Sequence, residues 1–196
     1  MNFKQIGDLA ILTVKEPMLG LRALQSLDLP VAARWMALVL AVALSTLLAG
    51  VVRLLFPVPV ENSVSRLIAQ PALLASIQFT AMVGSALLMT WVGRLFGGKG
   101  QFEDALLITA WIEMMLVGVQ AVQVVLMVVF PASAPIMSIL AFGLFLYLTV
   151  MLTKALHGFQ SAFLVILGFI GTMFVVGFAL SFIAVSFGIM PEIVVQ

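Results

Sequence analysis

The sequence predicts an all-α polytopic membrane protein with five transmembrane helices and short amphipathic helices before the first of them. Hydrophobic residues make up 64% of the 196 positions, charged residues only 9%, and the mean hydropathy is +1.28, whereas ordinary soluble domains contain about 25% charged residues. Apolar runs long enough to cross a bilayer core of about 30 Å recur five times. In lipid such runs must be helices, because a helix pairs its own backbone groups.

The five apolar runs fall at about residues 35–56, 71–95, 105–130, 136–156 and 159–190. The connections between them carry residues typical of turns, namely Phe56-Pro57-Val58-Pro59, Gly97-Gly98-Lys99-Gly100 and Pro131-Ala132-Ser133-Ala134-Pro135. No connection is long enough to hold a soluble domain. We therefore divide the chain into an amino-terminal segment, residues 1–30, and a transmembrane bundle, residues 31–196.

The distribution of basic residues predicts the orientation, since lysine and arginine in short loops are retained on the cytoplasmic side. Only Arg53 and Arg66 fall on the other side of the predicted membrane. Seven basic residues share the amino-terminal side, namely Lys4, Lys15, Arg22, Arg34, Arg94, Lys99 and Lys154. The amino terminus is thus expected in the cytoplasm and, after five spans, the carboxyl terminus on the opposite side.

Residues 1–30 have the pattern of two short amphipathic helices. Apolar residues such as Phe3 and Ile6 fall on one helical face and Lys4 on the other, and Glu16-Pro17 is typical of the start of a second helix. Two placements stay open: the helices lie in the cytoplasmic membrane interface, or they pack under the loops of the bundle.

Composition also excludes several classes of function. The net charge of +1 gives no basic field of the kind that attracts nucleic acid. The chain has no cysteine, so it has no thiolate nucleophile and no disulfide. Its single histidine, His157, argues against a histidine-rich metal site. We therefore expect no nucleic-acid partner, no cofactor, no metal and no enzymatic activity.

Glu113 is the most informative residue for function, because it lies about eight residues into the third apolar run, roughly 12 Å below its cytoplasmic end. A carboxylate there costs several kcal/mol unless it is paired, protonated or in a wet cavity, so we expect it to face the bundle interior. Gln120 shares its helix face, and Gln78 is another candidate polar partner. Two roles stay open: a proton or cation site, or an interhelical fastener paired with Lys154.

Titratable residues also gather on the predicted cytoplasmic side, namely Arg22, Lys99, Glu103, Asp104 and His157. Acid–base chemistry is one interpretation of four residues on this side, His157, Lys154, Glu103 and Asp104. However, charged residues are common at helix ends, where they complement the helix dipole, and no nucleophile elbow, phosphate-binding glycine loop or paired metal-ligand motif accompanies them. We predict that these residues form a face for a partner.

Three stretches together resemble the Yip family of small membrane proteins that interact with Ypt/Rab GTPases, and specifically its bacterial branch. They are Leu12-Thr13-Val14-Lys15-Glu16-Pro17, Gly97-Gly98-Lys99-Gly100-Gln101-Phe102 and Leu156-His157-Gly158-Phe159-Gln160-Ser161-Ala162. The resemblance covers nearly the whole chain. It implies a five-span helical bundle with a cytoplasmic amino terminus.

For eukaryotic relatives the resemblance also implies a non-enzymatic role in membrane traffic. Those relatives carry an Asp-Leu-Tyr-Gly-Pro motif before the first span; this chain lacks it, and its only tyrosine is Tyr147. A Rab-type GTPase is therefore not the expected partner. We expect a scaffold of the bacterial inner membrane that contacts lipid and binds another membrane protein or itself. The alternative is a small transporter or channel that uses Glu113.

Overall fold

The computed structural model describes residues 2–57 and 70–186, and within these two ranges the chain forms helices and no strand. The seven α-helices are α1 (Phe3–Lys15), α2 (Pro17–Gln25), α3 (Val31–Leu55), α5 (Pro71–Leu95), α6 (Phe102–Val129), α7 (Ala134–His157) and α8 (Ala162–Ser186). A 3₁₀ turn at Pro131–Ser133 precedes α7. Five of the helices, from α3 to α8, are long and apolar enough to cross a membrane, which confirms the predicted fold class.

The helix bounds differ from the predicted spans by a few residues. Helix α3 begins at Val31, earlier than predicted, because the extended backbone of Pro30 starts the helix directly after the amino-terminal segment. Helix α6 likewise begins at Phe102, after the extended Gln101. The last predicted run extended to residue 190, and its final four residues lie outside the described part of the chain.

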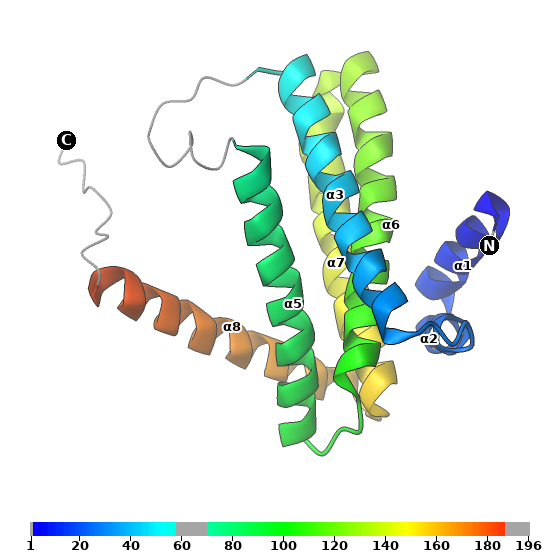
Figure 1. The fold of residues 1–196 in the computed structure, drawn as a ribbon, viewed down its shortest axis with the longest axis vertical. Helices are drawn as coiled ribbons and strands as arrows, with labels where there is room; N and C mark the ends of the chain where they lie inside the picture. Colours follow the sequence, from blue (N-terminus) through cyan, green and yellow to red (C-terminus); the bar gives the residue numbers. More distant parts are fainter. Residues whose placement is uncertain (1, 58–69, 187–196) are drawn as a thin grey trace.

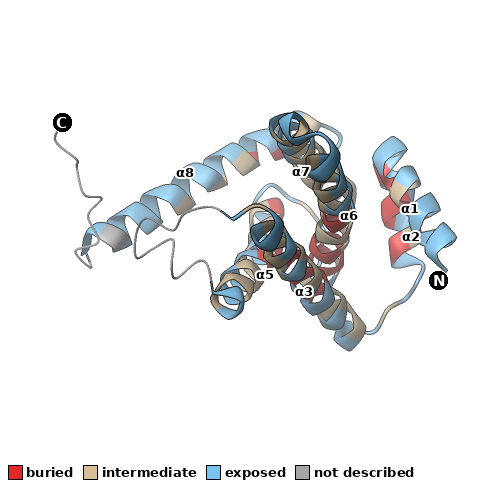
Figure 2. Ribbon diagram, turned by 90° about the horizontal axis from the view of Figure 1, so that it is seen from above, coloured by how far each residue is buried: buried red, intermediate tan, exposed pale blue. Residues whose placement is uncertain are grey.

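Helices α3, α5, α6 and α7 stand side by side as an upright bundle, with α6 in contact with each of the other three (Figure 1). The central place of α6 is visible in its burial, since every residue from Ala105 to Ala110 is buried. Viewed from above, the buried residues line the inner sides of the bundle and of α1 and α2 (Figure 2). The main core joins Leu38 of α3, Ala86 of α5 and Leu106 of α6.

Helices α1 and α2 pack on the bundle through their inner faces. Leu9 and Leu24 contact Leu107 of α6, and the indole N–H of Trp111 donates a hydrogen bond to the Thr13 hydroxyl over 3.1 Å. Charged and apolar residues of the two helices remain exposed, and among the apolar ones Phe3 is 94% exposed. The structure shows the second of the two placements, packing on the bundle, and contact with a membrane interface stays a prediction.

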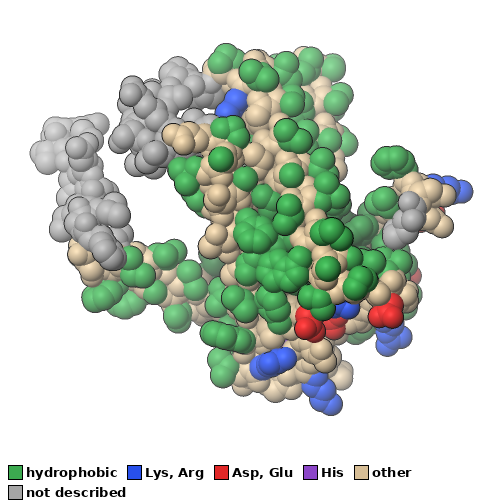
Figure 3. Space-filling view, viewed as in Figure 1, with side chains coloured by type: hydrophobic (Ala, Val, Ile, Leu, Met, Phe, Trp, Pro, Cys, Tyr) green, Lys and Arg blue, Asp and Glu red, His purple; other side chains and the backbone are tan. Residues whose placement is uncertain are grey.

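Helix α8 leaves the bundle at an angle, and its main contacts with the long helices are with α5 and α7 (Figure 1). Most of its surface is apolar and exposed, as Phe174 and Phe178 illustrate. Figure 3 shows hydrophobic side chains along the whole bundle, whereas most charged side chains gather at one end and on α1 and α2. This charged end contains α2, the α5–α6 loop and the carboxyl end of α7. We call it the α2 end of the bundle.

Candidate functional site

A polar cluster joins three helices in the middle of the bundle. Glu113 lies eleven residues after the start of α6, about 16 Å along the helix axis. The amide nitrogen Nε2 of Gln78 donates to Oε1 of Glu113 over 2.6 Å and to Oγ of Ser45 over 3.0 Å. Ser45 Oγ in turn lies 3.5 Å from Oε1 of Gln120. The cluster therefore links α3, α5 and α6 through side chains from each of them.

The structure brings together Glu113, Gln78 and Gln120, as their positions in the sequence predicted. Lys154, by contrast, makes no ion pair with Glu113 in the described part of the chain. It lies three residues before the end of α7 and is only partly buried. Ser45 was missed as a polar partner, because it falls in a stripe with Ala41 and Ala49 that is typical of close helix packing.

We expect Glu113→Leu to lower the free energy of unfolding by about 2 kcal/mol, because the partly buried amide of Gln78 would lose the shorter of its two hydrogen bonds. Glu113→Gln keeps an acceptor at that position and should cost less than half as much. Thermal unfolding of the purified protein in detergent measures both changes, with a fall of about 5 °C expected for the leucine variant. Val125→Leu, at an exposed position of α6, is the control, and equal midpoints for all three variants would contradict the role of this cluster.

His157 occupies a cage at the α2 end of the bundle. The residue is only 4% exposed. Its imidazole accepts a hydrogen bond at Nδ1 from the Gly100 N–H over 3.1 Å, and its Nε2 atom lies 3.0 Å from the Met89 carbonyl oxygen. Since Nδ1 accepts, Nε2 carries the proton and donates to Met89. The ring also stacks on Phe159, with a centroid distance of 5.3 Å.

Three glycines form the walls of this cage. A Cβ atom built on Gly93 or Gly98 would overlap the His157 ring, and one on Gly100 would lie 2.6 Å from its Cε1 atom. The α5–α6 loop can therefore close over the carboxyl end of α7 only because these positions carry no side chain. His157, which the sequence analysis assigned to the partner face, is thus buried in the helix packing.

Asp104 also makes internal contacts. Its Oδ1 atom pairs with Nη1 of Arg34 over 2.7 Å, and its Oδ2 atom accepts a hydrogen bond from Gln25 over 3.2 Å. The same Arg34 donates through Nε to the Leu29 carbonyl oxygen. Asp104 thereby ties the start of α6 to α2, to the following linker and to α3.

Of the predicted partner-face residues, Arg22, Lys99 and Glu103 remain exposed. Arg22 lies on α2, Lys99 in the loop between α5 and α6, and Glu103 in the first turn of α6. All three belong to the α2 end of the bundle. We refer to these three residues as the charged face.

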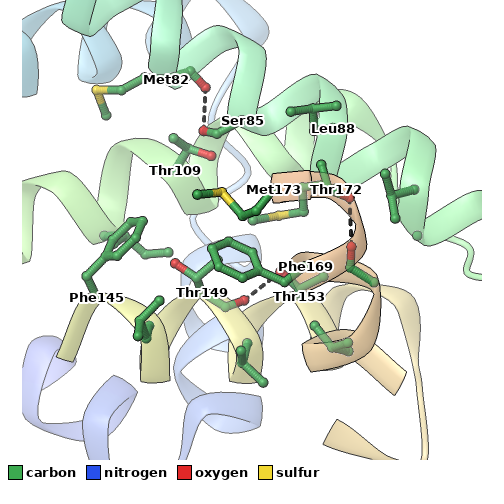
Figure 4. A pocket seen from close by; sticks show the side chains of 18 of the residues that line it. Met82, Ser85, Leu88, Thr109, Phe145, Thr149, Thr153, Phe169, Thr172 and Met173 are labelled. Carbon is green, nitrogen blue, oxygen red and sulfur yellow. Dashed lines mark hydrogen bonds between the residues drawn. The ribbon is translucent and has the colours of Figure 1, made fainter. Parts of the chain in front are cut away.

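A cavity of about 470 Å³ lies between α5, α6, α7 and α8 (Figure 4). Its lining is mostly apolar, and Glu113 and Gln78 contribute to its wall. In the described part of the chain no group of three or more histidine, cysteine, aspartate or glutamate side chains is placed to hold a metal ion.

These features define a multi-pass α-helical membrane protein whose polar side chains join helices and whose charged face lies at one end. The sequence profile of the Yip1 domain matches residues 15–183. The chain therefore belongs to the Yip1 domain family, as its resemblance indicated. Comparisons with curated proteins and with solved structures gave no match.

Two of the stretches that carried the resemblance meet in the structure. Gly98 and Gly100 come from the first, and His157 and Phe159 come from the second. They are far apart in the sequence, yet they pack together around one imidazole ring. In this chain both stretches thus contribute to one structural contact.

Proposed function

We propose that this protein is a non-enzymatic scaffold of the bacterial inner membrane, which binds another membrane protein or a second copy of itself through the charged face. The proposal rests on one observation: the side chains that could carry out chemistry instead bond to other parts of the same chain. His157, Asp104 and Glu113 each bond to a different helix or loop of the same chain. Arg22, Lys99 and Glu103 are left exposed at one end of the bundle, where a partner can reach them.

The proposed orientation supports a cytoplasmic partner. The charged face, α1 and α2 lie on the side that carries seven of the nine basic residues, which the positive-inside rule assigns to the cytoplasm. Exposed apolar residues of α1 and α2, such as Phe3 and Leu19, would rest in the same membrane interface. A partner could then contact the charged face and the lipid surface together, which favours a protein that is itself bound to the membrane.

The test is mass spectrometry of the proteins that copurify with the tagged chain after gentle extraction from its native membrane. A stoichiometric partner should be lost by about tenfold or more in Arg22→Glu or Lys99→Glu, since like-charge contacts cost several kcal/mol. Lys4→Glu, an equal charge change at an exposed position of α1, should retain the partner. Isolation of the chain alone, with no partner and no second copy, would contradict the scaffold.

Transport is the second candidate, and one observation favours it: Glu113 lies in the wall of the cavity. The predominantly apolar lining gives an ion little to bind, which favours the scaffold. Proteoliposomes distinguish the two functions. A proton or cation flux that is lost in Glu113→Gln would support transport and contradict the scaffold, which should retain its partner in that variant.

A further inference from the structure

The cavity between α5, α6, α7 and α8 has the features of a ligand site that the scaffold role does not use. Its volume of about 470 Å³ lies within the range of about 300–1,000 Å³ typical of small-molecule pockets. Such pockets are mainly apolar and contain a few polar groups that orient the ligand. Both properties are present here, since aliphatic and aromatic side chains surround Gln78, Glu113 and several hydroxyl groups.

One face of α8 forms a complete wall of the cavity. Its lining residues recur at helical spacing, namely Val165, Gly168, Phe169, Thr172, Met173 and Val176. At Gly168 the helix approaches α5 so closely that an added Cβ atom would lie 3.3 Å from the Phe96 ring. Other faces of α8, including Phe174 and Val175, are exposed and do not line the cavity.

The cavity opens toward the lipid-facing surface. Phe142 of α7 and Met173 of α8 both line it and are 62% and 61% exposed. Figure 4 shows Phe145 and Thr149 of α7 near Phe169 and Met173 of α8. An apolar molecule could therefore enter between α7 and α8 from the bilayer without crossing water.

The hydroxyl groups of the lining differ in whether they have a hydrogen-bond partner. Those of Thr109, Thr153 and Thr172 each donate to a carbonyl of their own helix. The buried hydroxyl of Thr149 has no hydrogen-bond partner, and such a group costs about 1–3 kcal/mol when it stays unpaired. On the α6 side, the Glu113 carboxyl already accepts from Gln78 and has the capacity to accept another hydrogen bond.

We propose that this cavity binds a single-chain lipid with an uncharged hydroxyl head, such as a long-chain alcohol. The apolar chain fits the lining of α5, α7 and α8. A hydroxyl group both donates and accepts hydrogen bonds, so it can pair with either polar group, as a donor to the Glu113 carboxyl or as an acceptor from the Thr149 hydroxyl. The lining contains no lysine or arginine, so an anionic head would lack a counter-charge. This proposal does not depend on the scaffold function.

The experiment uses the full chain in phosphatidylcholine vesicles with a long-chain alcohol that carries a photoreactive diazirine in its chain. After irradiation, mass spectrometry of the peptides should place the label on residues that line the cavity. Excess unlabelled alcohol should compete, whereas an alkane of equal length should compete at least about tenfold less well, because the polar groups of the site then lack a partner.

Two neighbouring valines provide a matched test. Val176→Trp adds a large ring to the cavity wall and should lower the specific labelling by about tenfold or more. Val175→Trp adds the same ring on an exposed face, since Val175 is 69% exposed, and should leave labelling unchanged. If Val176→Trp does not fold, Leu164→Trp at the wall and Leu167→Trp outside it form a second pair.

Three results would overturn the proposal. Label spread evenly over the exposed faces of α8 and insensitive to excess alcohol would mean ordinary contact with bulk lipid. Equal competition by the alkane would remove the role of the hydroxyl head. Stronger competition by a long-chain amine than by the alcohol would assign a cationic head to the site instead.

Discussion

Gly93→Ala should lower the free energy of unfolding by about 3 kcal/mol, because the new methyl group would overlap the caged His157 ring. The ring cannot simply move away, since it is bonded to the Met89 carbonyl oxygen and to the Gly100 N–H. The same change at Gly84 of the same helix meets no atom within 4 Å. It should be neutral or stabilising by up to about 1 kcal/mol, because alanine is the better helix former.

Thermal unfolding of both variants in detergent measures this difference. A double variant tests whether the overlap with the His157 ring is the cause. In Gly93→Ala combined with His157→Ala the overlap is removed, so the double variant should lose less free energy of unfolding than the sum of the two single variants. Equal stability of Gly93→Ala and Gly84→Ala, or strict additivity in the double variant, would contradict the cage.

The second large effect is expected at Gly20, where α2 crosses α1. A Cβ atom at Gly20 would lie 2.6 Å from the Cα atom of Thr13. Because this neighbour is backbone, the two helices would have to separate as a whole. Gly20→Ala should therefore weaken the docking of α1 and the hydrogen bond between Trp111 and Thr13.

Limited proteolysis reports on this docking, since local opening governs cleavage when the opening is fast. Trypsin cleaves after Lys15, at the end of α1. We expect cleavage there to accelerate about tenfold in Gly20→Ala, the equivalent of about 1.4 kcal/mol of local stability. Gly7→Ala, on α1 and with no atom within 4 Å of its new Cβ, should cleave like the unaltered protein. Equal rates for the two variants would show that the α1–α2 crossing tolerates a side chain.

The fold was accessible from the sequence because its strongest signals are local. Each long apolar run forms a helix wherever it lies in a bilayer, so all five spans could be found without knowledge of the packing. The start of α2 was equally local, since Glu16 precedes Pro17 in the first turn. Boundaries near Val31 and Phe102 shifted, because the polarity of a helix end changes gradually along the chain.

The site was accessible only in part, because its contacts join distant residues. The depth of Glu113 in an apolar run indicated an interior position, and Gln78 was a reasonable partner on the same ground. The burial of His157 could not be foreseen. Histidine at a helix end is common, and three glycines in α5 and its following loop become a cage only when that loop closes over α7.

The uneven distribution of buried residues along the bundle has a mechanical consequence. Helix α6 is continuously buried from Ala105 to Ala110, near its start, whereas most of its second half is partly or fully exposed. The His157 cage and the ion pair of Asp104 lie at that same end. The helices are thus held together most firmly at this one end of the bundle. A change in lateral pressure of the bilayer would spread the opposite tips of the helices first, while the clamped end kept its shape.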